Sequence, residues 1–296
     1  MHEIEDVAGK KVAVKGGGVC IYCGWDGGEE GLRDEHAVPY SLGGNTVLLK
    51  ASCGDCEAVT SYLDGYMANA IFGHLRVHLD LQSRSGHPST LPAIVELADG
   101  QRAVELATGD HPYFLNMPIW RPPGFMIGNQ LVEGFGDPGR FTYWYVPPKF
   151  RDVIGLGDRE IARVIDTSPA HNLNAFARGL AKIAYCNAVM KYGLDGFRHL
   201  ATRDIILGRY PNIAYFVGSD PTRPSPPYAR GRQHSVGLGS ITYKDTKFLT
   251  ATIRLFGDSG AGDKGMPFYT VIYGSEGRHR VVAKARMPRV LRQILL

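Results

Sequence analysis

The stretch CIYCGWDGGEEGLRDEHAVPYSLGG, residues 20–44, carries a Cys-x-x-Cys pair and then a carboxylate–histidine cluster. A second pair with the same spacing, Cys53 and Cys56, follows. Each pair can present two sulfurs to one metal at about 2.3 Å, and four thiolates complete a closed tetrahedral zinc site. Cys20, Cys23, Cys53 and Cys56 therefore predict one structural zinc ion. A disulfide or thiol-redox role is the alternative, and the presence of two such pairs disfavours it.

The residues between the two pairs predict an inserted β-hairpin, because they exceed the usual length of about 15–20 residues. LRDEHAVPY (32–40) is the expected first strand, ending near Pro39, which cannot donate to a ladder. SLGGNT supplies a loop whose glycines can adopt positive φ, and TVLLK (46–50) is the return strand. Apolar residues recur with helical spacing after Cys56, so a helix should follow.

This order of elements resembles the zinc-stapled form of the HNH nuclease family, which has a ββα-metal module. The resemblance covers about residues 18–80 and rests on the two cysteine pairs, Glu35-His36 followed by Pro39, Leu42-Gly43-Gly44, and the helix after Cys56. It implies a metal-dependent endonuclease that hydrolyses phosphodiester bonds of DNA, with RNA as the alternative substrate.

By this resemblance His36 is the general base and Glu35 is a ligand of a catalytic Mg²⁺ or Mn²⁺. A histidine suits proton abstraction near neutral pH, since its ordinary pKa is about 6.5. A divalent cation bound by oxygen ligands neutralises the charge that develops on the phosphate. The alternative is that His36 is a surface histidine on a hairpin used only for binding.

The chain departs from the family pattern at the helix. The family usually has Asn or His directly after the last cysteine, where this chain has Glu57, and no asparagine stands on the return strand. Carboxylates suit Mg²⁺, and Asp64 lies two helical turns after Glu57 on the same face. Glu57 and Asp64 are therefore candidate ligands beside Glu35. Strand alternation puts Asp34 and His36 on one face and Glu35 on the other; the resemblance favours Glu35 as the ligand, and alternation favours Asp34.

The whole chain, 296 residues and 44% hydrophobic, is long enough for two domains. We expect an α+β protein with the zinc-stabilised HNH module at 1–90 and an α+β accessory domain with a mostly antiparallel sheet at 91–296. Residues 83–92 have a linker composition. The accessory half carries no phosphate loop, and target recognition or formation of a homodimer is the role expected of it.

Sequence patterns in the second half predict one long helix and several strands. AHNLNAFARGLAKIAYCNAVMKYG (170–193) has one apolar face and a terminal glycine. A hairpin should turn at Asp99-Gly100. The other expected strands are 139–148, 210–218, 234–243, 247–257 and 267–274, whereas 114–128 should be a packed irregular segment.

The net charge of +4 is compatible with a nucleic-acid partner without requiring one. Candidate phosphate-binding residues are Arg76, Arg84 and, in the basic C-terminal stretch, Arg286 and Arg289. No signal peptide and no run of eighteen apolar residues is visible, so we expect a cytoplasmic protein outside the membrane. The rival hypothesis from another class is a non-catalytic, zinc-stabilised nucleic-acid-binding module.

Overall fold

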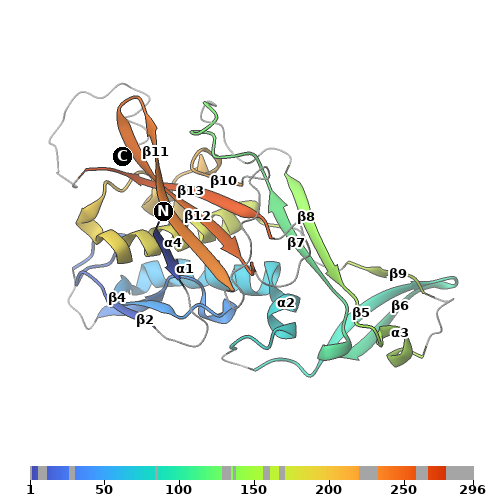
Figure 1. Ribbon diagram of the computed structural model, residues 1–296. Coiled ribbons are helices and arrows are strands. Elements are labelled where there is room, and N and C mark those ends of the chain that lie inside the picture. The colour runs from blue at the N-terminus through green and yellow to red at the C-terminus, as the bar shows by residue number, and fades with distance from the viewer. Residues whose placement is uncertain are drawn as a thin grey trace.

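The structure is a computed structural model that describes residues 2–5, 12–26, 31–83, 86–128, 135, 138–155, 161–166, 171–219, 233–257 and 266–277 (Figure 1). These residues form helices and four β-sheets. Among the described strands every pair is antiparallel except β2 with β4. The prediction of an α+β fold with mostly antiparallel sheets is confirmed.

The cysteine-rich part folds as a small sheet covered by a helix. Its strand order is β2 (Val12–Lys15), β4 (Thr46–Cys53) and β3 (Leu32–His36). Helix α1 (Gly54–Tyr66) follows β4 directly, continues into a π-helical turn (Met67–Ile71) and is succeeded by α2 (Gly73–His78). The predicted hairpin and helix are confirmed. The first strand ends earlier than expected because Tyr40–Leu42 form a 3₁₀ turn, and β2 was not predicted.

A larger sheet is built from both ends of the chain. Its order is β1 (His2–Glu5), β11 (His234–Tyr243), β12 (Thr246–Leu255), β13 (Phe268–Ser275) and β10 (Val217–Ser219). The three strands expected between residues 234 and 274 are confirmed. The strand expected at 210–218 was wrong for most of its length, because residues 213–215 hydrogen-bond locally in a 3₁₀ turn and leave only β10 extended.

A two-stranded ribbon and a three-stranded sheet lie beyond it (Figure 1). The ribbon pairs β7 (Tyr113–Ile119) with β8 (Gly139–Tyr145), and the sheet has the order β6 (Gly100–Ala107), β5 (Thr90–Leu97) and β9 (Ile161–Ile165), with the short α3 (Phe150–Val153) beside it. The hairpin is confirmed, but its turn is at Ala98-Asp99, one residue earlier than predicted, because Gly100 already pairs with Leu97. The irregular conformation expected at 114–128 was wrong for β7, whose whole length pairs with β8.

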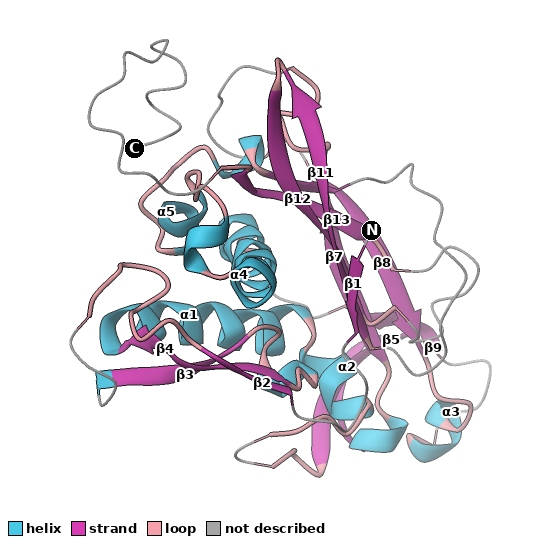
Figure 2. Ribbon diagram, turned by 60° about the vertical axis from the view of Figure 1, so that its left-hand side comes forward, coloured by secondary structure: helices cyan, strands magenta, loops and turns pink. Residues whose placement is uncertain are grey.

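Helix α4 (Leu173–Tyr192) is the centre of the main core. Its ends follow local rules: the side chain of Asn172 accepts a hydrogen bond from the backbone N–H of Ala175, and Gly193 has a φ of 72°. The helix lies between α1 on one side and the five-stranded sheet on the other (Figure 2). The short α5 (Thr202–Ile206) packs against it.

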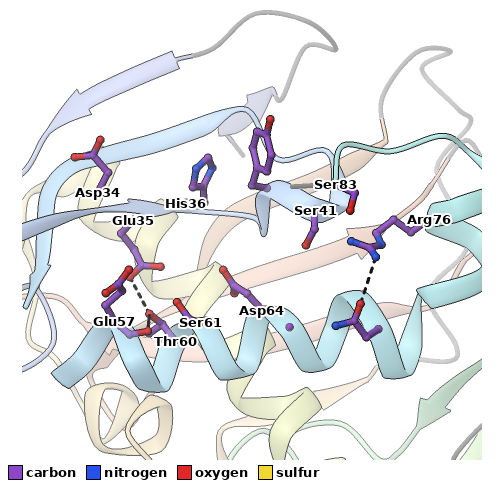
Figure 3. A pocket seen from close by; sticks show the side chains of 13 residues that line it. Asp34, Glu35, His36, Ser41, Glu57, Thr60, Ser61, Asp64, Arg76 and Ser83 are labelled. Carbon is purple, nitrogen blue, oxygen red and sulfur yellow. Dashed lines mark hydrogen bonds between the residues drawn. The ribbon is translucent and has the colours of Figure 1, made fainter. Parts of the chain in front are cut away.

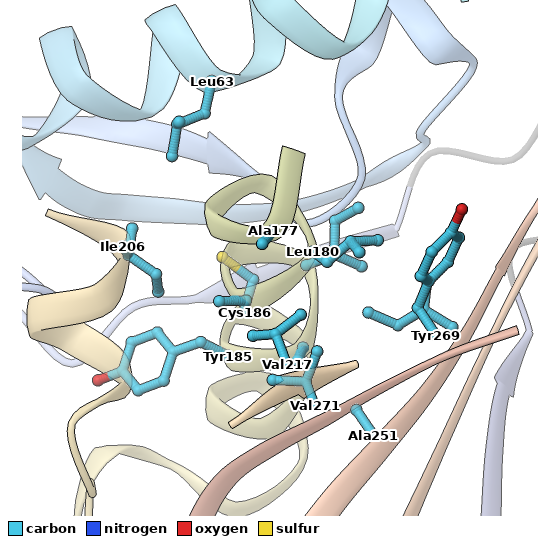
Figure 4. Close-up of a cluster of buried hydrophobic side chains, with 14 of the residues drawn as sticks. Leu63, Ala177, Leu180, Tyr185, Cys186, Ile206, Val217, Ala251, Tyr269 and Val271 are labelled. Carbon is cyan, nitrogen blue, oxygen red and sulfur yellow. The ribbon is translucent and has the colours of Figure 1, made fainter. Parts of the chain in front are cut away.

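The buried side chains around α4 come from both halves of the sequence (Figure 4). Leu63 and Met67 from the cysteine-rich part belong to the same apolar cluster as Leu180 of α4 and Tyr269 of β13, and all four are fully buried. The division of the chain at residue 90 stays a prediction, but the main core is continuous across it. No helix in the described ranges has both the length and the apolar character that crossing a membrane requires.

Candidate functional site

The four cysteines predicted to bind zinc converge. Their Sγ atoms all lie within 4.8 Å of one another, and those of Cys23 and Cys53 are 3.7 Å apart. Bonds of about 2.3 Å from a tetrahedral zinc ion would place the sulfurs about 3.8 Å apart. All four are free thiols. The cluster can therefore hold one metal ion such as zinc.

Backbone geometry around Cys20 supports binding through its thiolate. Gly24, with a φ of 79°, donates its N–H to the carbonyl of Cys20 at 2.8 Å and closes the turn of the first pair. Burial raises the pKa of Cys20, but hydrogen bonds from the backbone N–H groups of Cys23, Cys53 and Tyr22 lower it by a larger amount. The net pKa of Cys20 therefore lies below the ordinary value. The thiolate is the form that binds metal.

A second site is an open pocket of about 340 Å³ between β3, the 3₁₀ turn and α1 (Figure 3). Asp34, Glu35 and Glu57 lie toward one end of it, Arg76, Ser41 and Ser83 toward the other, with Asp64 between them. Its lining includes Asp34, Glu35, His36, Tyr40, Ser41, Glu57, Thr60, Asp64, Asn69, Arg76 and Ser83. The fold thus brings His36, the three candidate metal ligands and one candidate phosphate ligand into one cavity.

The faces of β3 follow strand alternation. Asp34 and His36 lie on one side of the strand, and Glu35 points to the other, toward α1 (Figure 3). Glu35 is 4% exposed and accepts a hydrogen bond from the Thr60 hydroxyl at 3.0 Å. Glu35 is thus the carboxylate of β3 that faces the helix.

Asp34 has a different role in the strand pair. The register between β3 and β4 shifts between Arg33 and Glu35, and Lys50 on β4 adopts a φ of 50°. The backbone N–H of Lys50 donates to Asp34 Oδ1 at 3.0 Å. The irregular pairing leaves the backbone N–H of Lys50 without a backbone partner on the opposite strand, and the Asp34 carboxylate accepts its hydrogen bond. Asp34 therefore stabilises the β-bulge.

Sequence reasoning missed Lys182, which reaches the carboxylate end of the pocket from α4. Its side chain is 0% exposed, and its Nζ lies 2.9 Å from Glu35 Oε1 and 2.8 Å from each oxygen of Asp64. The signal in the sequence was a lysine among the apolar residues of a buried helix. Lysines are almost never fully buried without a charged partner.

The charges of this trio depend on one another. Burial lowers the pKa of Lys182, but the carboxylates of Asp64 and Glu35 raise it more, so its net pKa lies above the ordinary value. Burial raises the pKa of Asp64 to about 6, although the ammonium of Lys182 opposes that shift. Lys182 is therefore a permanent cation, and Asp64 is mostly ionised only above about pH 6.

Glu57 is more accessible than the other two candidate ligands. Its Oε2 lies 3.1 Å from Nε of Arg33, and the two side chains are 39% and 63% exposed. Exposed ion pairs of this kind contribute about 0–1 kcal/mol to stability. The Glu57 carboxylate can therefore exchange Arg33 for another cation at little cost.

Arg76 lies at the opposite end of the pocket. Its Nη2 donates to Asn69 Oδ1 at 3.3 Å, and its Nε has no acceptor within the described part of the chain. Arg76 lines the pocket together with Ser41 and Ser83. The other candidate phosphate ligands, Arg84, Arg286 and Arg289, lie outside the described residues.

Comparison of the chain with protein-family models, with curated proteins and with solved structures found no match. The likeness to HNH nucleases therefore stays a prediction from the residues quoted above.

Proposed function

We propose that this protein is a metal-dependent endonuclease of the HNH type that hydrolyses phosphodiester bonds of DNA, with the pocket beside β3 as its active site. The observation that carries the proposal is the lining of that pocket. It combines a histidine, three acidic residues facing α1 or projecting from it, and an arginine in one open cavity next to a four-cysteine cluster.

His36 is the general base in this proposal. It lines the pocket from the end of β3, with its ring centroid 5.3 Å from that of Tyr40. From there it can take a proton from a water molecule that attacks the phosphorus atom. General-base assistance typically contributes about 10²–10⁴-fold in rate.

The carboxylate end of the pocket suits a hard divalent cation. Glu57, with Glu35 and Asp64 beside it in the pocket lining, would hold Mg²⁺ or Mn²⁺, which prefers carboxylate and water oxygens. When bound, such an ion neutralises charge on the phosphate and on the leaving oxygen. The open pocket leaves room for the water molecules that Mg²⁺ retains.

Arg76 would hold the phosphodiester at the other end. A guanidinium offers a planar fork of donors that matches phosphate oxygens, and the hydroxyls of Ser41 and Ser83 add neutral donors. The phosphate would then lie between Arg76 and the carboxylates, within reach of His36. DNA is the proposed substrate; a cytoplasmic location and a homodimer stay predictions.

The cysteine cluster would have a structural role, with zinc as its ion. It joins the turn at Cys20 to the end of β4 and the start of α1. Glu57 lies in the first turn of α1, and Glu35 and His36 lie on β3, which pairs with β4. Zinc bound there would contribute folding free energy to this small sheet and to the helix that follows it.

One observation favours the rival function, a zinc-stabilised nucleic-acid-binding module without catalysis. Lys182 contacts Glu35 and both oxygens of Asp64, so two of the three carboxylates already have a cation. In that case the pocket would bind a phosphate through Arg76 and cleave nothing.

Nicking of supercoiled plasmid separates the two functions. The parental protein should nick DNA with Mg²⁺ or Mn²⁺ and stop when EDTA is added, and His36→Ala should lose about 10²–10⁴-fold in rate while keeping its fold, zinc and DNA affinity. His171→Ala is the matched control, since His171 is partly buried and does not line the pocket. A His36→Ala variant as fast as the parent would refute the catalytic assignment, and binding without cleavage would favour the rival. A single-stranded RNA tested in parallel decides between the two nucleic acids.

A further inference from the structure

The ammonium of Lys182 lies where the carboxylates of β3 and α1 approach each other. Three carboxylate oxygens, one from Glu35 and two from Asp64, surround it at 2.8–2.9 Å. The side chain belongs to α4, the helix that packs against α1 (Figure 2). Oxygens from two carboxylates around one positive charge are also the surroundings that a hard divalent cation selects.

Two cations do not share this position. A divalent ion bonded to the same oxygens at about 2.1 Å would lie close to an ammonium that already contacts them at 2.8–2.9 Å. The repulsion between them would act in a largely buried environment, where charges are poorly screened. Any exchangeable ion is therefore displaced toward the open side of the pocket, where Glu57 is 39% exposed.

Charge balance explains why a cation is needed there at all. Glu35 is 4% exposed and Asp64 lies beside it, so two carboxylates are placed together with little solvent. Without an opposite charge they would repel each other, and one of them would bind a proton. Lys182 supplies that charge permanently, independent of the metal concentration.

We propose that Lys182 is a built-in counter-cation that fills the inner half of the carboxylate site and confines the exchangeable divalent metal to the outer half, with Glu57 as its main protein ligand. Lys182 is thus a positioning residue: it holds Glu35 and Asp64 in place and keeps the metal affinity of the pocket low. The part that concerns an exchangeable catalytic metal rests on the proposed function, whereas the part that concerns Lys182 does not.

The test is a Mn²⁺ titration of the zinc-loaded protein without DNA, followed by electron paramagnetic resonance. Lys182→Met keeps the apolar stem and removes the charge, so it should bind Mn²⁺ at least about tenfold more tightly than the parent, because two adjacent carboxylates lose their cation. Lys182→Met/Asp64→Asn should bind Mn²⁺ about as the parent does. Lys191→Met, a partly buried lysine of the same helix, is the control and should change nothing.

A purely structural role for Lys182 predicts a different result. It would lower the stability of Lys182→Met and leave the Mn²⁺ affinity unchanged, and that outcome would overturn the proposal. If Lys182→Met fails to fold without metal, Mn²⁺ or the second substitution Asp64→Asn should restore its circular dichroism and zinc content. Failure of both to restore folding would also overturn it.

The Mn²⁺ affinity of Lys182→Met can be measured whether or not the protein is a nuclease. Tighter Mn²⁺ binding by Lys182→Met, in a protein whose parent cuts no nucleic acid, would support the counter-cation and refute the proposed function. Unchanged Mn²⁺ binding in a protein whose parent is a nuclease would refute the counter-cation alone.

Discussion

The hydroxyl of Tyr185 donates a hydrogen bond of 2.8 Å to the carbonyl oxygen of Ile21, across 164 residues of sequence. Beside this contact, the hydroxyl of Tyr22 lies 3.4 Å from Sγ of Cys186. Both contacts join the middle of α4 to the turn between Cys20 and Cys23. The cysteine cluster is therefore connected to the main core, so loss of a metal ion bound there should lower the stability of more than the small sheet.

We expect one zinc ion per chain, held by the four clustered cysteines. Cys53→Ser should lose the zinc and unfold the small sheet, because thiolate–zinc bonds supply much of its folding free energy. Metal analysis and thermal unfolding measure the two effects. Cys186→Ser is the matched control: Cys186 is fully buried and lies outside the cluster, so its zinc content should stay at the parental level. Purified parent with far less than one zinc per chain, or with a Cys20–Cys23 disulfide, would contradict the prediction.

Replacement of Glu57 should weaken metal binding and leave much of the catalytic rate at saturating metal. Glu57→Ala should cut DNA more slowly than the parent at low Mg²⁺ and recover part of the rate at high Mg²⁺ or Mn²⁺, because a lost ligand lowers affinity. The measurement is the nicking rate as a function of metal concentration. Asp55→Ala is the control, since Asp55 is an exposed acid in the same first turn of α1 and does not line the pocket. A rate that stays low at every metal concentration would argue against a role confined to metal affinity.

Arg76→Gln should reduce the salt dependence of DNA binding. A protein releases counterions from each phosphate it contacts, so one lost contact lowers the slope of log K against log salt by about 0.9. Fluorescence anisotropy at several salt concentrations gives that slope. Arg163→Gln is the matched control, because Arg163 is 67% exposed and pairs with Glu96 on the three-stranded sheet. Equal slopes for Arg76→Gln and the parent would show that Arg76 does not contact a DNA phosphate.

The raised pKa of Asp64 should appear in the pH dependence of stability. Burial raises the pKa of Asp64 from 3.8 to about 6, so the folded chain binds more protons than the unfolded chain between these values. The contribution of Asp64 to the free energy of unfolding therefore falls as the pH rises toward 6 and is constant above it. Relative to Asp64→Asn, the parent should lose about 1 kcal/mol between pH 5 and pH 7. Urea unfolding of both proteins at pH 5, 6 and 7 measures it; a difference that does not change with pH would contradict the raised pKa.

The sequence alone was sufficient where the determining interactions are local. Two cysteines two residues apart form a turn that points both sulfurs the same way, so the cluster was predictable from spacing. The period of apolar residues, with Asn172 and Gly193 at the ends, determines α4 in the same way. The hairpin of β5 and β6 was predictable from Asp99-Gly100, a dipeptide that favours tight turns, although the register puts the turn one residue earlier.

Tertiary structure decided the environment of the charged residues. Asp64 and Lys182 meet across 118 residues, and no local pattern in either segment indicates the other. The pairing of Asp34 with the bulge also depends on the positive φ of Lys50, which lies on the neighbouring strand. The parallel pairing of β2 with β4 is likewise non-local, and a four-residue strand has too short a pattern to predict it. The physical reason is common to all three: the free energy of a buried charge or a paired backbone depends on which distant group fills the space beside it, and only the packed chain determines that group.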